Sequence, residues 1–421
     1  MHNESNLMTT SAEFSAREKR FNDAASLKKP DRIPLAFVAH YYPARMAGIS
    51  YKQAISDHAM GFSAFRDFTR KLDLDMAPTP YTLIPAQPCA ELGLIQYKVP
   101  GYGLADNLPH QYVEKEYLQA EEYDAFLDNP DNFTVRKIWP RIARTLEPLA
   151  EFPPAHMILD ARALILGGGG LVGTPAYQAL LKALLRLGEE VNAYKDAEKQ
   201  YTAEMKKLGF PILTMAGARA PFDFLSDFLR GLKGSTLDMY LRPEKLLKAV
   251  ELLTPVCYQA GLNNAKAAGN PRVFVTLHRG AGGFMSDEQF AKFYWPSLKK
   301  VLLILVDAGL TPIVFFEGDY TPRLEYLAEL PKGKIVGHFD VIDRKKARKI
   351  IGNNMCFWGN VSAQTLIMGN PDKVRDDVMD LIDTFGDTGG LIIDGTVGIP
   401  DEAKPENVEA MVNTVFKHGT Y

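Results

Sequence analysis

Eight short apolar runs rich in β-branched residues recur along the chain, and each ends in a glycine, a proline or a polar residue. Most are followed by an amphipathic stretch of helical period, which is the alternation typical of βα units. The runs lie at 33–39, 74–80, 211–217, 273–278, 312–317, 334–340, 355–361 and 390–395. Eight parallel strands separated by helices predict an α/β fold of the (β/α)8 TIM-barrel class rather than a doubly wound sheet.

Helices are expected between several of these strands, at 287–309, 343–352 and 371–386. The last has Asp372 in its first turn and Gly386 just past its end, as helix termini prefer. The segment 81–210 is too long for a single loop. We therefore expect one barrel domain over 1–421, with 81–210 as a helical and loop insertion packed on the barrel rim.

The composition limits the classes of partner. A chain of 421 residues with 46% hydrophobic and 24% charged residues is typical of a soluble globular protein. Its formal charge of −3 provides no basic face for nucleic acid. No run of about 18 apolar residues is long enough to span a membrane. The opening residues lack the apolar core of a secretory signal, which predicts a cytoplasmic protein, and three isolated cysteines predict reduced packing residues.

Polar residues follow the predicted strands at the point where each strand ends. In a barrel these ends meet at one mouth, where catalytic residues gather. A polar residue at the start of any single βα loop is ordinary, but several histidines and carboxylates at corresponding ends indicate a site. The set comprises His40, Tyr41 and Tyr42, His278 and Arg279, Glu317 and Asp319, His338 and Asp340, Asn360 and Asp394.

Four stretches resemble the uroporphyrinogen decarboxylase superfamily. They read "KKPDRIPLAF", "FDFLSDFLRGLKGSTLDMYLRPEKL", "GGFMSDEQFAKFYWPSLKKVL" and "GNVSAQTLIMGNPDKVRDDVMDLID", the last leading to "GTVGIPDEAKPENVEAMV". The resemblance covers nearly the whole chain and implies a (β/α)8 barrel and a homodimer. It also implies one of two chemistries, which are porphyrinogen decarboxylation and methyl transfer to or from a corrinoid protein.

The segment after the first strand separates these two chemistries. Decarboxylases of the superfamily resemble one another in an arginine-rich "RQAGR" stretch that grips the carboxylates of the porphyrinogen. This chain reads "AHYYPARMAGI" instead, with Arg45 as its single arginine. Such a segment suits the wall of a pocket for a small aromatic substrate. The predicted substrate-binding residues are His40, Tyr41, Tyr42, Arg45, His278, Arg279, Phe315, Phe316 and Asp340.

The resemblance also bears on metal binding. Thiol-methylating members carry an H-x-C-G element and a later "PGCGIP", whose side chains hold zinc. The corresponding positions here are Phe315, Glu317 and Val397, which argues against zinc–thiolate chemistry. Carboxylate and imidazole ligands still form an acceptable catalytic zinc shell, so Glu317, His338 and His278 are the predicted zinc ligands. The alternative is that Glu317 pairs with Arg279 or with a histidine.

The function implied is that of the methyltransferase I component of O-demethylases. Such a protein moves a methyl group from an aryl methyl ether to the Co(I) corrinoid of a partner protein. Glu317 and His338 are expected to stabilise the departing oxygen through the metal or as general acids, supported by Asp319. A decarboxylase and a corrinoid-protein docking component without turnover are the alternatives, and the methyl donor stays open.

A run of four glycines, Gly167 to Gly170, is the remaining motif. It lacks the lysine of a phosphate-binding loop and fits a flexible turn or close backbone packing better.

Overall fold

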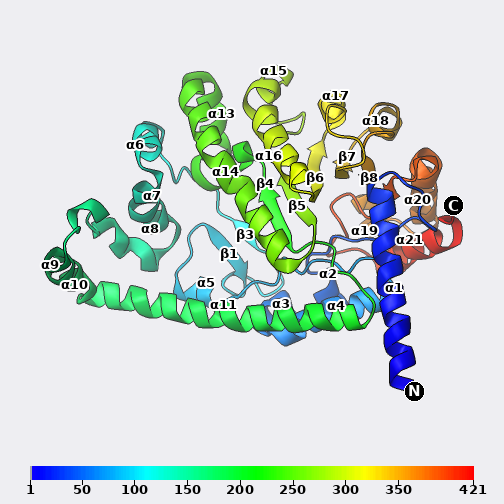
Figure 1. The fold of residues 1–421 in the computed structure, drawn as a ribbon, viewed down its shortest axis with the longest axis horizontal. Coiled ribbons are helices and arrows are strands. Elements are labelled where there is room, and N and C mark those ends of the chain that lie inside the picture. Colours follow the sequence, from blue (N-terminus) through cyan, green and yellow to red (C-terminus); the bar gives the residue numbers. More distant parts are fainter. Residues whose placement is uncertain (1) are drawn as a thin grey trace.

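The computed structural model describes residues 2–421, with side chains from Thr10 onward. Its main sheet contains six parallel strands in the order in which they occur along the chain (Figure 1). They are β4 (Ala216–Arg219), β5 (Arg272–Leu277), β6 (Thr311–Asp319), β7 (Val336–Val341), β8 (Cys356–Trp358) and β9 (Leu391–Ile392). Sequential order and parallel direction are the topology of a βα barrel.

Two extended segments continue this sheet from both of its edges. Single parallel bridges join Leu35 to Ile393, Ala36 to Met76, and Ala77 to Ile212. Regular strand pairing therefore does not close the sheet, although all eight predicted strand positions take part in the ring. Prolines explain the irregularity, since Pro34, Pro78, Pro80 and Pro211 lack the N–H group that a regular ladder requires. The predicted α/β barrel class is confirmed.

Helices cover the outer face of the sheet. They are α2 (Tyr42–Met46), α3 (Tyr51–Ser56), α4 (His58–Leu72), α12 (Pro221–Leu225), α13 (Gly231–Leu241), α14 (Pro243–Ala268), α15 (Asp287–Gln289), α16 (Trp295–Asp307), α17 (Leu324–Leu327), α18 (Arg344–Ile351), α19 (Ala363–Met368), α20 (Pro371–Phe385) and α21 (Pro405–His418). Local chemistry fixes their starts. Asn370 accepts a hydrogen bond from the backbone N–H of Lys373 at 3.0 Å and so caps α20, and Asp343 caps α18 in the same way through Lys346.

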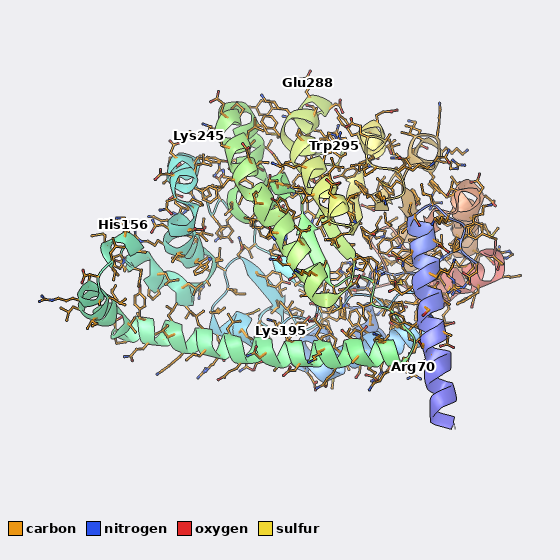
Figure 2. The ribbon with its side chains drawn as sticks, viewed as in Figure 1. Arg70, His156, Lys195, Lys245, Glu288 and Trp295 are labelled. Carbon is orange, nitrogen blue, oxygen red and sulfur yellow. The ribbon has the colours of Figure 1, made fainter. Side chains whose placement is uncertain are left out.

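Residues 81–210 form a small sheet and a series of short helices that end in one long helix. The elements are α5 (Gln87–Glu91), β1 (Tyr97–Pro100), β2 (Gly103–Leu104), β3 (Gln111–Tyr112), α6 (Tyr123–Asp128), α7 (Pro130–Phe133), α8 (Trp139–Ile142), α9 (Ala161–Ala163), α10 (Gly169–Val172) and α11 (Pro175–Lys207). Helix α11 runs along one edge of the molecule and leads the chain back to the barrel (Figures 1 and 2). The assignment of 81–210 as an insertion in a single domain stays a prediction.

The end of the barrel where the strands begin is covered by α1 (His2–Ala25). Its residues Phe21, Ala24 and Ala25 share one buried cluster with inward-facing strand residues such as Ile313 and Val336. An apolar plug of this kind removes water from the strand starts. Among the described residues the plug closes this end of the barrel, and the partly exposed inward-facing residues lie toward the other end.

No single helix in the described part of the chain is long and apolar enough to cross a membrane. Two helical segments, Ala161–Val172 and Pro175–Lys207, reach the required length and apolarity only when joined, and they meet at a bend of 85°.

Candidate functional site at the strand ends

The inner face of β4, β5 and β6 is accessible to solvent. On β5, Val275 and Leu277 are fully buried, whereas Phe274, Thr276 and His278 are partly exposed. Successive side chains point to opposite sides of a strand, and helices bury the outer set. The partly exposed set therefore faces the barrel interior. We call these inward-facing residues of the three strands the open wall: Gly217, Arg219, Phe274, Thr276, His278, Phe315 and Glu317.

Three aromatic rings form the deeper layer beside the open wall. The His338 ring lies 5.0 Å from the Phe315 ring and 4.4 Å from the Trp358 ring, measured between centroids. Its Nε2–H donates to the backbone oxygen of Gly395 at 3.0 Å, and its Nδ1 atom has no partner among the described residues. Burial lowers the pKa of His338 to about 4, so this imidazole is neutral at physiological pH.

Asp394 is fully buried next to this layer. It accepts hydrogen bonds from the backbone N–H groups of Val38 and Gly395, both at 2.8 Å, and one of its oxygens lies 3.5 Å from His338 Nε2. Burial raises the pKa of Asp394 well above its usual range. The carboxyl group is thus held inside the barrel without a positively charged partner among the described residues.

His278 and Glu317 meet above the aromatic layer. His278 Nε2 lies 3.8 Å from Glu317 Oε2, and half of the Glu317 side chain is exposed. The other ring nitrogen, Nδ1, donates to Asp227 at 2.5 Å. Asp227 lies on the short π-helical turn Ser226–Arg230 that follows α12. The ring is therefore fixed from behind while its Nε2–H faces the interior.

Asp223 holds the same loop from below. Its carboxylate accepts from the backbone N–H of His278 at 2.8 Å, from the N–H of Arg279 at 3.0 Å and from the Tyr294 hydroxyl at 2.6 Å. Arg279 in turn contacts Asp227 at 3.2 Å. We call Asp223, Asp227, His278, Arg279 and Glu317 the charged cluster.

The charged cluster sets the protonation state of its members. Burial lowers the pKa of His278, but the hydrogen bond and charge of Asp227, with the charges of Asp223 and Glu317, outweigh it and raise that pKa to about 9. Burial also raises the pKa of Glu317, where the nearby charge of Asp340 opposes the favourable effect of His278. Burial and the charge of Asp227 raise the pKa of Asp223 to about 6. At neutral pH the cluster therefore presents a protonated imidazole to the interior.

Other predicted site residues support the loops around this cluster. Asp340 accepts from the backbone N–H of Gly318 at 3.0 Å, which fixes the chain directly after Glu317. Asp319 accepts from the N–H of Thr321 at 2.8 Å and so stabilises the turn at the end of β6. Both carboxylates lie beside the charged cluster in the chain and shape its backbone.

The predicted aromatic wall requires correction. Phe316 is fully buried and stacks on Phe339 of β7 at 4.8 Å, on the outer face of the sheet. Tyr42 lies on α2 and packs edge-on against Phe68 of α4, while Tyr41 is buried against Tyr51. Strand alternation explains the first error, because adjacent residues such as Phe315 and Phe316 cannot face the same side.

Arg45 and His40 also differ from expectation. Arg45 donates to the backbone oxygens of Asp401 and Ala403 at 2.6 and 3.2 Å, so it anchors a loop instead of facing the mouth. His40 is half-buried, hydrogen-bonds the Tyr81 hydroxyl and approaches the backbone oxygen of Val397 at 3.3 Å. Burial lowers the pKa of His40 to about 4, which leaves a neutral ring at the mouth.

The three predicted zinc ligands are not brought together. His278 and Glu317 are neighbours, but His338 lies in the layer below and donates to Gly395. In the part of the chain that the structure describes, no group of three or more His, Cys, Asp or Glu side chains is arranged to hold a metal ion. The residues therefore do not fit the expected zinc centre, and Glu317 pairs with a histidine as in the alternative interpretation.

Sequence reasoning missed Asp223 and Asp227. Their spacing of four residues directly after a predicted strand places both on one side of a helical turn at the mouth. That spacing was the feature of the sequence that could have identified them, although two acidic residues on one side of a helix more often face solvent.

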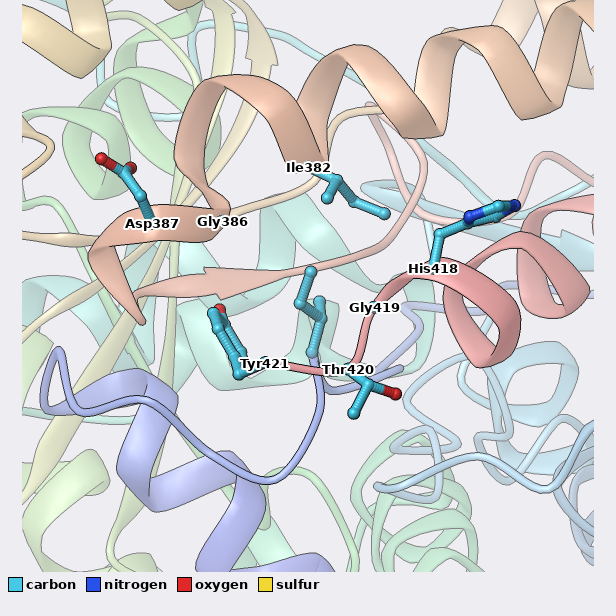
Figure 3. Close-up of a pocket in the computed structure, with 8 residues that line it drawn as sticks. Ile382, Gly386, Asp387, His418, Gly419, Thr420 and Tyr421 are labelled. Carbon is cyan, nitrogen blue, oxygen red and sulfur yellow. The ribbon is translucent and has the colours of Figure 1, made fainter.

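A cavity of about 220 Å³ lies at the opposite end of the barrel (Figure 3). It lies between the end of α20 and the C-terminal segment, and its lining includes Ile33, Ile382, Asp387, His418 and Tyr421. Its carboxylate, Asp387, is paired with Arg348 at 3.0 Å. The charged cluster thus has no counterpart in this cavity.

Comparisons with known proteins show which proteins this chain is similar to. Residues 189–418 match the profile of the family described as "Uroporphyrinogen decarboxylase (URO-D)". A uroporphyrinogen decarboxylase of Aromatoleum aromaticum is 25% identical over 296 residues, which cover 65% of this chain and 81% of that protein. The corresponding enzyme of Syntrophotalea carbinolica is 26% identical over 180 residues, which are 42% of this chain and span only 50% of the relative.

The fold is similar to that of a solved structure titled "methyltransferase from Methanosarcina mazei". The two structures share a TM-score of 0.63 at 15% sequence identity, over 95% of this chain and 98% of the other. Similarity at this level of identity concerns the fold.

Proposed function

Because this chain belongs to the uroporphyrinogen decarboxylase family, we propose that it acts in the methyltransferase branch of that fold. In this proposal it moves a methyl group from an aryl methyl ether to the reduced corrinoid of a partner protein. The fold similarity to a methanogen methyltransferase supports this branch. The observation that carries the proposal is the protonated His278 paired with Glu317 at the open end of the barrel.

Breaking a methyl–oxygen bond requires help at the oxygen. The bonding electrons stay on the oxygen when the methyl group leaves, so a proton donor there stabilises the developing charge. The corrinoid of the partner supplies the electron pair that forms the new bond to the methyl carbon. The chain itself has to bind the ether, hold it with the methyl group outward and protonate the phenolate oxygen.

The residues of the open wall suit these tasks. His278 Nε2–H is the proton donor, and Asp227 holds the ring through Nδ1. Glu317 lies 3.8 Å from that nitrogen, and its negative charge favours the uptake of a proton from solvent by the ring after transfer. Phe315 supplies an aromatic face for the substrate ring next to Phe274, whose ring centroid lies 6.4 Å away.

A direct assay tests this function. The purified protein is incubated with a reduced corrinoid protein and a panel of methoxyarenes. Methylation of the corrinoid is followed by visible absorption, and the released phenol is measured by chromatography. Methyl transfer in step with phenol release is the expected result. An inert mixture, with a corrinoid partner shown to be active toward another methyl donor, would contradict the proposal.

Decarboxylation is the second candidate, because the curated relatives carry that name. The mouth argues against a polycarboxylate substrate, since the charged cluster and Asp340 bring four carboxyl groups to it. Arg45 is bound to backbone oxygens, and Arg279 is paired with Glu114 at 2.7 Å and with Asp227. Release of CO2 from a porphyrinogen without any corrinoid protein would favour this candidate.

A further inference from the structure

Arg219 is an inward-facing arginine on the open wall. Its neighbour Ala218 faces outward, where a side-chain atom added at Gly261 of α14 would lie 3.4 Å from the Ala218 methyl group. Alternation along β4 therefore turns Arg219 toward the barrel interior. The register supports this, because Arg219 pairs with Thr276 and, through it, with Phe315 on the same inner face.

Arg219 has no acceptor among the described residues, which is unusual for an arginine in this position. Other arginines near the strand ends are all bound: Arg279 to Glu114 and Asp227, Arg344 to Asp377 and Asp380, and Arg45 to backbone oxygens. The Arg219 side chain is partly buried, so its positive charge is screened less than on an open surface and attracts an anion that enters the mouth. The position therefore calls for an anion supplied from outside the chain.

The neighbours of Arg219 indicate what kind of anion this is. The guanidinium carbon lies 4.7 Å from the centre of the Phe228 ring. Phe228 itself contacts Tyr112 and Phe224, with ring centroids 5.4 and 5.3 Å away. A guanidinium next to one ring of an aromatic cluster suits a planar carboxylate on an aromatic ring, which it binds through two parallel hydrogen bonds.

We propose that Arg219 binds the carboxylate of an aromatic acid, so that the substrate class is the methoxybenzoates and not the uncharged methoxybenzenes. The choice of a methoxy group rests on the proposed function. Thr276, the register partner of Arg219, precedes His278 by two residues, which corresponds to about 6.6 Å along the strand. That separation is close to the length of a disubstituted benzene ring, so a carboxylate at Arg219 leaves the methoxy oxygen near His278.

A binding experiment on the protein alone tests this assignment without the methyl transfer reaction. Binding of 4-methoxybenzoate and of methoxybenzene is measured by calorimetry for the unchanged protein, Arg219→Gln and Arg219→Lys. Arg70→Gln is the matched control, because Arg70 lies on the outside of the molecule at the end of α4 (Figure 2). Neutral methoxybenzene reports on the integrity of the pocket in each variant.

The expected result is that Arg219→Gln weakens binding of the benzoate at least about tenfold and leaves methoxybenzene binding unchanged. Arg219→Lys keeps the charge but loses the paired geometry, so its effect should be smaller. Equal affinity of the unchanged protein and Arg219→Gln for the benzoate overturns the assignment, as does an equal loss for both ligands. Benzoate binding that depends on Arg219 but leads to no methyl transfer would leave the assignment intact and overturn the proposed function instead.

Discussion

The two ends of the barrel both bury carboxylates, but they neutralise them differently. Where the strands begin, the fully buried Asp75 accepts from Arg32 at 2.7 and 2.9 Å, from the N–H of Leu35 at 2.8 Å, and from Arg20. Where the strands end, Asp394 accepts only backbone N–H groups, and the charged cluster contains more carboxylates than cations.

This difference indicates that the strand starts contribute to stability and the strand ends to chemistry. At the strand starts the buried carboxylate of Asp75 is matched by Arg20 and Arg32, as expected of a region that holds the fold together. At the strand ends burial raises the pKa values of Asp223, Glu317 and Asp394, and the neighbouring carboxylates outweigh burial to raise that of His278; such shifts are typical of functional sites. Variants of the two ends should therefore have separable effects.

The largest expected effect is on methyl transfer in His278→Gln. Loss of the proton donor should reduce the rate constant of transfer by roughly 10² to 10⁴. Stopped-flow absorption of the corrinoid measures it, with thermal unfolding to confirm the fold. His156→Gln serves as the control, since His156 is exposed and lies on the segment that precedes α11 (Figure 2). If the rate constant for His278→Gln lies within a factor of two or three of the control, the assignment of the chemistry to the strand ends is contradicted.

Asp75→Asn should lower stability and leave the rate constant of methyl transfer unchanged. Removing this carboxylate leaves Arg20 and Arg32 without their shared acceptor, so the free energy of unfolding should fall by about 3 kcal/mol. Urea denaturation measures that loss, and the rate constant of transfer below the transition should stay unchanged. An unaltered unfolding midpoint would show that the matched charges at the strand starts contribute little to stability.

The pH dependence of transfer sharpens the comparison further. His278 has a pKa of about 9, so the rate should be constant near neutrality and decline as pH rises through about 9. Asp227→Asn removes the main partner and should move this decline to lower pH by about one unit or more. Protonation of His278 also stabilises the folded protein, because its pKa is higher in the folded than in the unfolded chain. This stabilisation is complete below about pH 6.5 and is lost as pH rises through about 9. A decline at the same pH in both proteins would assign the proton to another group.

The smallest effects are expected from the adjacent pair Phe315 and Phe316. Phe316→Leu should reduce stability by roughly 1 kcal/mol without changing KM, because Phe316 packs on the outer face. Phe315→Leu should raise KM severalfold and alter stability less. Steady-state kinetics and urea denaturation of both variants provide the check, and matching changes in KM would contradict the assignment of faces.

Much of the fold could be predicted because it depends on local patterns. The apolar runs ending at Glu317 and His278 are long enough to identify strands, and parallel neighbours place their ends together. Three of the five residues of the charged cluster were predicted, whereas Asp223 and Asp227 lie on the helical segment after β4, whose orientation depends on tertiary packing.

The sequence did not show how deep in the barrel each side chain lies or which way it points. His338 and Glu317 both lie near the ends of neighbouring strands, yet Phe315, not Glu317, is the register partner of His338. A prediction based on strand ends alone therefore assigned Glu317 and His338 to one zinc site, although they lie in different layers of the barrel. Arg219 was overlooked for a related reason, because only the outer contacts of Ala218 show which way the next side chain points.

Among the described residues, the plug formed by α1 closes the strand-start end of the barrel and leaves the mouth at the strand ends as the entrance. In the proposed reaction a small donor and a bulky acceptor protein must both use that entrance, and the acceptor covers it once docked. The donor therefore has to arrive first, and the demethylated phenol can escape only after the acceptor has departed. Compulsory-order kinetics through a ternary complex follow from the position of one helix at the far end of the molecule.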